Sequence, residues 1–250
     1  MPNYDGVNAK MERAEQHLAD FEAVLGPWVG AKPISFVSRP LANGSGEELL
    51  VHIDPPMPQE LDLILGDCIH NLRSVLDHLA MTLAIANGAD PYDRSISFPV
   101  FDEETNYRAN GVRSIRTLTT AAQAFIEEQQ PFKRSTNAWM LTELQSLDNR
   151  DKHRSLIAHE PTQIAAFDDP AGVQTTYVAA PRIEEGALIA TVTYEASYTG
   201  PRGVQPLVPL AVTVERSNRI GFIEVQPFLR DQLLPYIDNN IVDEAMRQFP

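Results

Sequence analysis

The sequence predicts an α+β fold, in which helices and strands occupy separate parts of the chain. Helical periodicity dominates the first 157 residues, apart from one short hairpin. From about residue 158, β-branched and alternating runs separated by turn residues dominate instead. Because the strands follow the helices rather than alternate with them, we expect a meandering antiparallel sheet rather than a parallel one.

Helices are predicted where apolar residues recur at helical spacing. They cover residues 8–25, 59–86, 119–128 and 135–157. Gly26 and Pro27 should end the first helix, and Thr119 or Thr120 should cap the third. The segment 89–116, between the second and third helices, is expected to be rich in loops.

Strands are predicted in two groups. Residues 34–37 and 49–53 flank the loop-forming sequence Asn43-Gly44-Ser45-Gly46 and should form a hairpin. The later runs are 173–179, 187–198, 208–215 and 220–225, followed by a closing helix over 228–249. The expected organisation is a helical bundle with a hairpin insertion over 1–157 and a sheet with a closing helix over 158–250. A single continuous domain is the alternative.

Composition limits the classes of function. Hydrophobic residues make up 43% of the chain, which is enough for a core. The formal net charge of -14 disfavours a broad electrostatic grip on nucleic acid or on an anionic membrane. Cys68 is the only cysteine, so an internal disulfide and a cysteine-based zinc finger are excluded. We expect no signal peptide and no membrane span, and therefore a soluble cytoplasmic protein.

The second helix carries an unusual polar face between Leu65 and Leu83. Its short polar side chains form one ridge: Asp67, His70, Asn71, Ser74, Asp77 and His78. A solvated face is one interpretation, because every surface helix has one. However, residues 61–99 contain no Lys and no Glu, the flexible residues that usually decorate such faces. A functional site is therefore the competing interpretation.

The fourth helix offers a second group of polar residues. Its apolar line through Leu144 and Leu147 continues in register to Asp151 and Arg154, and His153 lies beside them. A charge on a core-facing line must be paired or lie at a cleft. Asp151 and Arg154 can pair with each other, meet the ridge of the second helix, or form a solvated helix end.

The stretch Arg73-Ser74-Val75-Leu76-Asp77-His78 fits the pattern R-x4-H within a long helix. It resembles the signature of the HEPN superfamily (higher eukaryotes and prokaryotes nucleotide-binding), and the resemblance covers roughly residues 59–157. The resemblance implies metal-independent RNA cleavage without a cofactor, often by a homodimer, with RNA or a nucleotide as partner. It assigns phosphate stabilisation to Arg73 and proton transfer to His78. The supporting residues would be Asp67, His70, Asp77, Asp151, His153 and Arg154.

Two other classes of function stay open. Asp67, His70 and His78, with Asp151 or His153, could supply metal ligands from two facing helices. Alternatively, the polar ridge is a buried hydrogen-bond network that fixes helix register in a non-catalytic interaction module. The sequence contains no Gly-rich phosphate loop and no G-x-S-x-G nucleophile motif.

Overall fold

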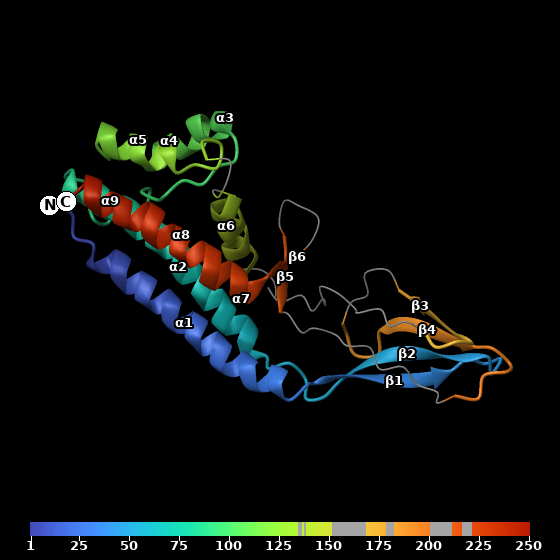
Figure 1. Ribbon diagram of the computed structural model, residues 1–250. Coiled ribbons are helices and arrows are strands. Elements are labelled where there is room, and N and C mark those ends of the chain that lie inside the picture. The colour runs from blue at the N-terminus through green and yellow to red at the C-terminus, as the bar shows by residue number, and fades with distance from the viewer. Residues whose placement is uncertain (135–136, 138, 152–168, 179–182, 201–211, 217–221) are drawn as a thin grey trace.

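The computed structural model describes residues 1–134, 137, 139–151, 169–178, 183–200, 212–216 and 222–250. It confirms the α+β class. Figure 1 shows two long helices side by side, α1 (Asp5–Gly30) and α2 (Glu60–Ala86), with a four-stranded sheet beyond one end of them. The two termini meet at the other end, where Tyr4 Oη donates to the Phe249 carbonyl at 2.8 Å.

The first helix is longer than its sequence predicts. It continues through Gly26 and Pro27 to Gly30. A tertiary contact explains the extension: Trp28 is buried, and its Nε1 donates to the Pro55 carbonyl at 3.0 Å. Burial of an indole with a bonded N–H outweighs the one backbone hydrogen bond that Pro27 cannot make.

The main core lies among the helices. The apolar face of α2 is buried from Leu61 to Leu83, as its periodicity predicts, and packs against α1. Two shorter helices close this core, α5 (Thr120–Glu128) and α6 (Trp139–Asp151). The Thr119 hydroxyl accepts from Ala122 N–H at 3.2 Å, which confirms the predicted cap. Residues 152–157, the rest of the predicted fourth helix, lie outside the described residues.

The segment between α2 and α5 is more helical than expected. It contains the short turns α3 (Glu104–Asn106), the π-helical η1 (Tyr107–Gly111) and α4 (Val112–Ser114). Tyr107 anchors the turns, because it is almost fully buried and packs against Phe101 and Phe132. Aromatic packing therefore holds a segment whose local sequence indicates a loop.

The four-stranded sheet joins the predicted hairpin to the first two of the four later runs. Its antiparallel order is β1-β2-β4-β3, whereas the runs predicted at 208–215 and 220–225 contribute to a separate two-stranded sheet. The strands are β1 (Ile34–Pro40), β2 (Gly46–Ile53), β3 (Val173–Tyr177) and β4 (Leu188–Tyr194). A second core on this sheet includes Leu49, Val51, Ile189 and Val192.

The C-terminal part returns to the helical bundle. A two-stranded sheet of β5 (Thr213–Glu215) and β6 (Phe222–Glu224) leads into it. The predicted closing helix is a continuous helical segment whose register changes at π-helical stretches. Its parts are α7 (Val225–Pro227), η2 (Phe228–Leu233), α8 (Leu234–Ile237), η3 (Asp238–Val242) and α9 (Asp243–Gln248). Within the described part of the chain, no helix is long and apolar enough to span a membrane.

Candidate functional site

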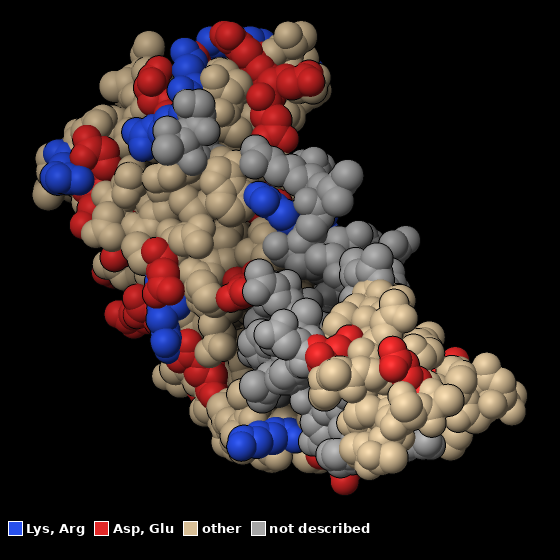
Figure 2. Space-filling view, turned by 45° about the vertical axis from the view of Figure 1, so that its right-hand side comes forward, with Lys and Arg blue, Asp and Glu red and all other residues tan. Residues whose placement is uncertain are grey.

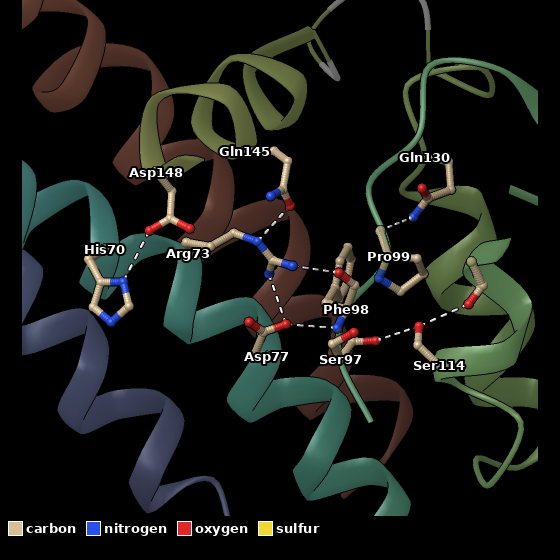
Figure 3. A network of polar contacts seen from close by, with 11 residues as sticks. His70, Arg73, Asp77, Ser97, Phe98, Pro99, Ser114, Gln130, Gln145 and Asp148 are labelled. Carbon is tan, nitrogen blue, oxygen red and sulfur yellow. Dashed lines mark hydrogen bonds and ion pairs between the residues drawn. The ribbon is translucent and has the colours of Figure 1, made fainter. Parts of the chain in front are cut away.

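Arg73 is the centre of a polar network on α2 (Figure 3). Its side chain is 11% exposed. Its Nε donates to Gln145 Oε1 at 2.9 Å, and its Nη2 donates to the Phe98 carbonyl at 2.8 Å. Its Nη1 donates to Asp77 Oδ1 at 2.9 Å. The guanidinium thus ties α2 to α6 and to the segment that follows α2.

Asp77 extends this network to the backbone. The same Oδ1 that pairs with Arg73 accepts the Phe98 N–H at 2.9 Å. Gln130 holds the other side of this segment, since its Nε2 donates to the Pro99 carbonyl at 2.8 Å and its Oε1 accepts the Phe101 N–H at 3.1 Å. Arg73 and Asp77 therefore stabilise the packing of residues 97–101 on the bundle (Figure 3).

His70 and Asp148 form a second contact between α2 and α6, one helical turn of α2 before Arg73. His70 Nδ1 lies 3.0 Å from Asp148 Oδ1, and the two side chains are 54% and 4% exposed. A buried carboxylate that holds Nδ1 fixes the orientation of the imidazole. When Nδ1 carries the proton, Nε2 on the opposite side of the ring is a base. This is the arrangement that general acid–base catalysis needs.

Asp151, at the end of α6, lies directly against α2 near this pair. A Cβ placed on Gly66 would be 2.4 Å from Asp151 Oδ1, so glycine permits the approach of the carboxylate. Burial, followed by the negative charges of Asp148 and Asp67, raises the pKa of Asp151 above its ordinary value. Asp67 itself is exposed. Asp151, which continues the apolar line of α6, therefore meets the polar ridge of α2. This is one of the three arrangements that the sequence left open for Asp151.

The side chain of His78 packs against α1, whereas that of Arg73 bonds to α6. Its ring lies at the start of α1, where a Cβ on Gly6 would be 2.8 Å from its Nδ1. Burial lowers the pKa of His78, and the charge of Lys10 lowers it further. Lys10 also donates to the Asn71 side chain at 3.2 Å. Within one chain, the two residues of the R-x4-H pattern thus belong to separate groups of contacts.

The structure does not describe all of the predicted site residues. His153 and Arg154 lie outside the described residues. In the part of the chain that the structure describes, no three His, Cys, Asp or Glu side chains are arranged to hold a metal ion. Asp67, His70, His78 and Asp151 do not form such a group among the described residues, and His153, the other candidate ligand, lies outside them.

Sequence reasoning missed two side chains that matter here, Asp148 and Gln145. Both lie on α6, and Asp148 stands four residues after the buried Leu144, on the same face of the helix. Asp148 is buried because α6 packs against α2 at His70. The helical spacing from Leu141 and Leu144 was the signal that could have identified Asp148 as buried, but its partner on α2 could not be read from α6 alone.

The chain matches no family model, no curated protein and no solved structure in comparisons with each. The resemblance to HEPN proteins therefore stays a prediction that rests on Arg73, His78 and the helix that carries them.

Proposed function

We propose that the protein is a metal-independent ribonuclease in which His70, oriented by Asp148, transfers the proton. The observation that carries this proposal is the contact of a half-exposed imidazole with an almost fully buried carboxylate at 3.0 Å. A buried carboxylate at Nδ1 selects the tautomer and holds the ring, as it does in catalytic Asp–His pairs. RNA is proposed as the substrate from the HEPN resemblance.

The proposal gives His70 the role that the R-x4-H resemblance assigns to His78. His70 is backed by an acid, whereas His78 is next to the cation Lys10, which disfavours the protonated imidazole. The role of Arg73 changes as well, because its guanidinium already has three intramolecular partners. We infer that Arg73 positions α6, and therefore Asp148, instead of contacting phosphate.

The chemistry follows from these groups. His70 Nε2 removes the proton of a ribose 2′-hydroxyl, whose oxygen attacks the adjacent phosphorus while the bond to the 5′-oxygen breaks. The products are a 2′,3′-cyclic phosphate and a 5′-hydroxyl, and the leaving oxygen must receive a proton. Asp151 is the proposed donor, because its carboxyl lies against α2 at Gly66, one helical turn from His70, and burial raises its pKa above the ordinary value.

The charge of the protein indicates local rather than broad contact with RNA. On the face drawn in Figure 2, acidic and basic side chains among the described residues form small mixed groups without one continuous basic patch. With a net charge of -14, binding should show only a shallow dependence on salt. A homodimer and a cytoplasmic location are further parts of the proposal.

The test is cleavage of single-stranded RNA in excess EDTA by the wild type and three single-histidine variants. His70→Ala should lower the rate on the order of 100-fold, the usual contribution of a general acid–base group. His52→Ala is the matched control, because the His52 side chain is about as exposed as that of His70 and also contacts a carboxylate, Glu185 at 3.1 Å, but the Glu185 side chain is 61% exposed whereas that of Asp148 is buried. It should retain full activity.

The third variant, His78→Ala, separates this proposal from the R-x4-H assignment. It should cleave at the wild-type rate if His70 transfers the proton. Loss of cleavage in His78→Ala with an unchanged rate in His70→Ala would overturn the proposal. Absence of cleavage by the wild type on any single-stranded RNA would overturn the ribonuclease function altogether.

A non-catalytic interaction module is the second candidate, and the Arg73 network favours it. All three partners of Arg73 are within the chain, which is what a network that fixes helix register requires. This candidate predicts that wild-type protein does not cleave RNA and that His70→Ala changes stability alone. Cleavage that depends on His70 would exclude it.

A further inference from the structure

The proposed site at His70 is surrounded mostly by negative charge. Asp148 and Asp151 lie on the α6 side, and Asp67 is exposed on α2 one helical turn before His70. Cleavage of a phosphodiester builds up negative charge on the phosphate oxygens, which a fixed cation must offset. Arg73 does not serve, because its guanidinium already has three partners within the chain. The site therefore needs another cation.

Lys10 of α1 supplies a cation beside this site. Its Nζ donates to Asn71 Oδ1 at 3.2 Å, and Asn71 directly follows His70 on α2. Asn71 is buried, and its Nδ2 donates to the Asp67 carbonyl at 2.8 Å, so the orientation of its amide is fixed. Successive helix positions point about 100° apart. Lys10 from α1 and Asp148 from α6 therefore contact neighbouring positions of α2, on two sides of its polar ridge.

The charge of Lys10 is not neutralised by an acid. Its side chain forms no ion pair among the described residues, and its hydrogen-bond partner Asn71 is uncharged. An ammonium has three donor hydrogens, so two remain for a ligand. Its neighbour His78 does not compete for an anion, because burial and the charge of Lys10 lower the pKa of His78 and favour the neutral ring. In a chain with a net charge of -14, this is a cation held ready for an anion.

We propose that Lys10 binds the phosphate that is attacked by the 2′-hydroxyl deprotonated at His70. Its ammonium donates to a non-bridging phosphate oxygen, while Asn71 holds the Nζ in place. A lysine ammonium acts on phosphate as a compact point charge and does not need the bidentate geometry of a guanidinium. The proposal rests on the ribonuclease function proposed above. It gives Lys10 the role that the R-x4-H resemblance assigns to Arg73.

The test is binding of a fluorescently labelled single-stranded oligodeoxynucleotide, which has no 2′-hydroxyl and is therefore not cleaved. Fluorescence anisotropy gives its Kd at KCl concentrations from about 20 to 200 mM. Lys10→Gln should raise the Kd about tenfold at low salt. The slope of log Kd against log salt should become shallower by about 0.7, the contribution of one phosphate contact on a single strand. Lys10→Arg should keep the wild-type slope, because the charge remains.

Lys32→Gln is the matched control for the loss of one positive charge. Lys32 is exposed just beyond the end of α1, and its side chain forms no ion pair among the described residues. Its replacement should change neither the Kd nor the slope. Lys10→Met, which keeps the aliphatic stem, replaces Lys10→Gln if that variant does not fold. Equal effects of the Lys10 and Lys32 variants, or no binding by the wild type, would overturn the proposal.

Cleavage of single-stranded RNA in EDTA separates this proposal from the function on which it rests. Wild-type cleavage together with unchanged binding and unchanged cleavage in Lys10→Gln would overturn the role of Lys10 alone. Absence of cleavage by the wild type, together with binding that depends on Lys10, would overturn the ribonuclease function and leave the phosphate contact of Lys10 standing.

Discussion

Replacement of Arg73 by methionine tests the network that joins α2, α6 and residues 97–101. Methionine keeps the length and the apolar part of the side chain and removes the guanidinium. The change leaves the Phe98 carbonyl and Gln145 Oε1 without the donor that now serves them. Asp77 keeps its bond from Phe98 N–H.

The magnitude follows from the three hydrogen bonds. Bonds to a charged group contribute about 1.5–3 kcal/mol each when buried. The bond to Asp77 counts for less, because the Asp77 side chain is 39% exposed and solvent screens the pair. Since methionine recovers some packing, we expect Arg73→Met to lower the free energy of unfolding by about 3 kcal/mol. For a chain of this size the melting temperature should fall by about 6–12 °C.

The assay is thermal melting followed by far-UV circular dichroism, with Arg39→Met as the matched control. Arg39 also bonds to an acid, Glu48 at 2.7 Å, but it is exposed on an edge strand, so its loss should cost under about 1 kcal/mol. Similar shifts for the two variants would refute the reasoning that the Arg73 network holds the bundle together.

Three further predictions concern individual contacts. Gly6→Ala should lower the melting temperature of the wild type but raise that of the His78→Ala variant, because the added Cβ would lie 2.8 Å from His78 Nδ1. Shifts of the same sign in both backgrounds would count against this packing. Asp151 has a raised pKa, so the folded state holds this proton more tightly than the unfolded chain, and stability is lost as pH rises from the ordinary pKa through the raised one. Asp151→Asn should therefore stabilise the protein more at pH 7 than at pH 3, as measured by urea midpoints, and a pH-independent difference would refute the cause. Thr119→Ala should lower the free energy of unfolding by about 1 kcal/mol, because the α5 cap is lost. Thr117→Val should be nearly neutral, because the Thr117 hydroxyl makes no hydrogen bond among the described residues. Equal urea midpoints for the two variants would show that the cap contributes nothing.

The helices were predictable because burial follows the local spacing of apolar residues. The periodicity from Leu61 to Leu83 identifies the buried face of α2, and Thr119 marks the start of α5 correctly. The end of α1 was not predictable, because the burial of Trp28 depends on Pro55, which is distant in sequence. Tertiary contact there overrides a local helix-stop signal.

For the sheet and the site, too, local patterns could be predicted from the sequence, whereas contacts between distant segments could not. Each strand has a β-type pattern, but the pairing of β2 with β4 joins residues nearly 150 positions apart and leaves no mark in either segment. The ridge on α2 could be identified, including His70 and Asp77. The ridge does not show that Asp77 belongs to a structural group around Arg73, or that the half-exposed His70 contacts a buried acid, because both depend on residues of α6, namely Gln145 and Asp148.

The most direct test of the central claim is a double-mutant cycle on RNA cleavage in EDTA with His70→Ala, Asp148→Ala and the double variant. Because Asp148 is proposed to act only through His70, the double variant should be no slower than His70→Ala alone. Separate losses that multiply in the double variant, or a wild-type rate in His70→Ala, would contradict the claim that these residues form one proton-transfer centre.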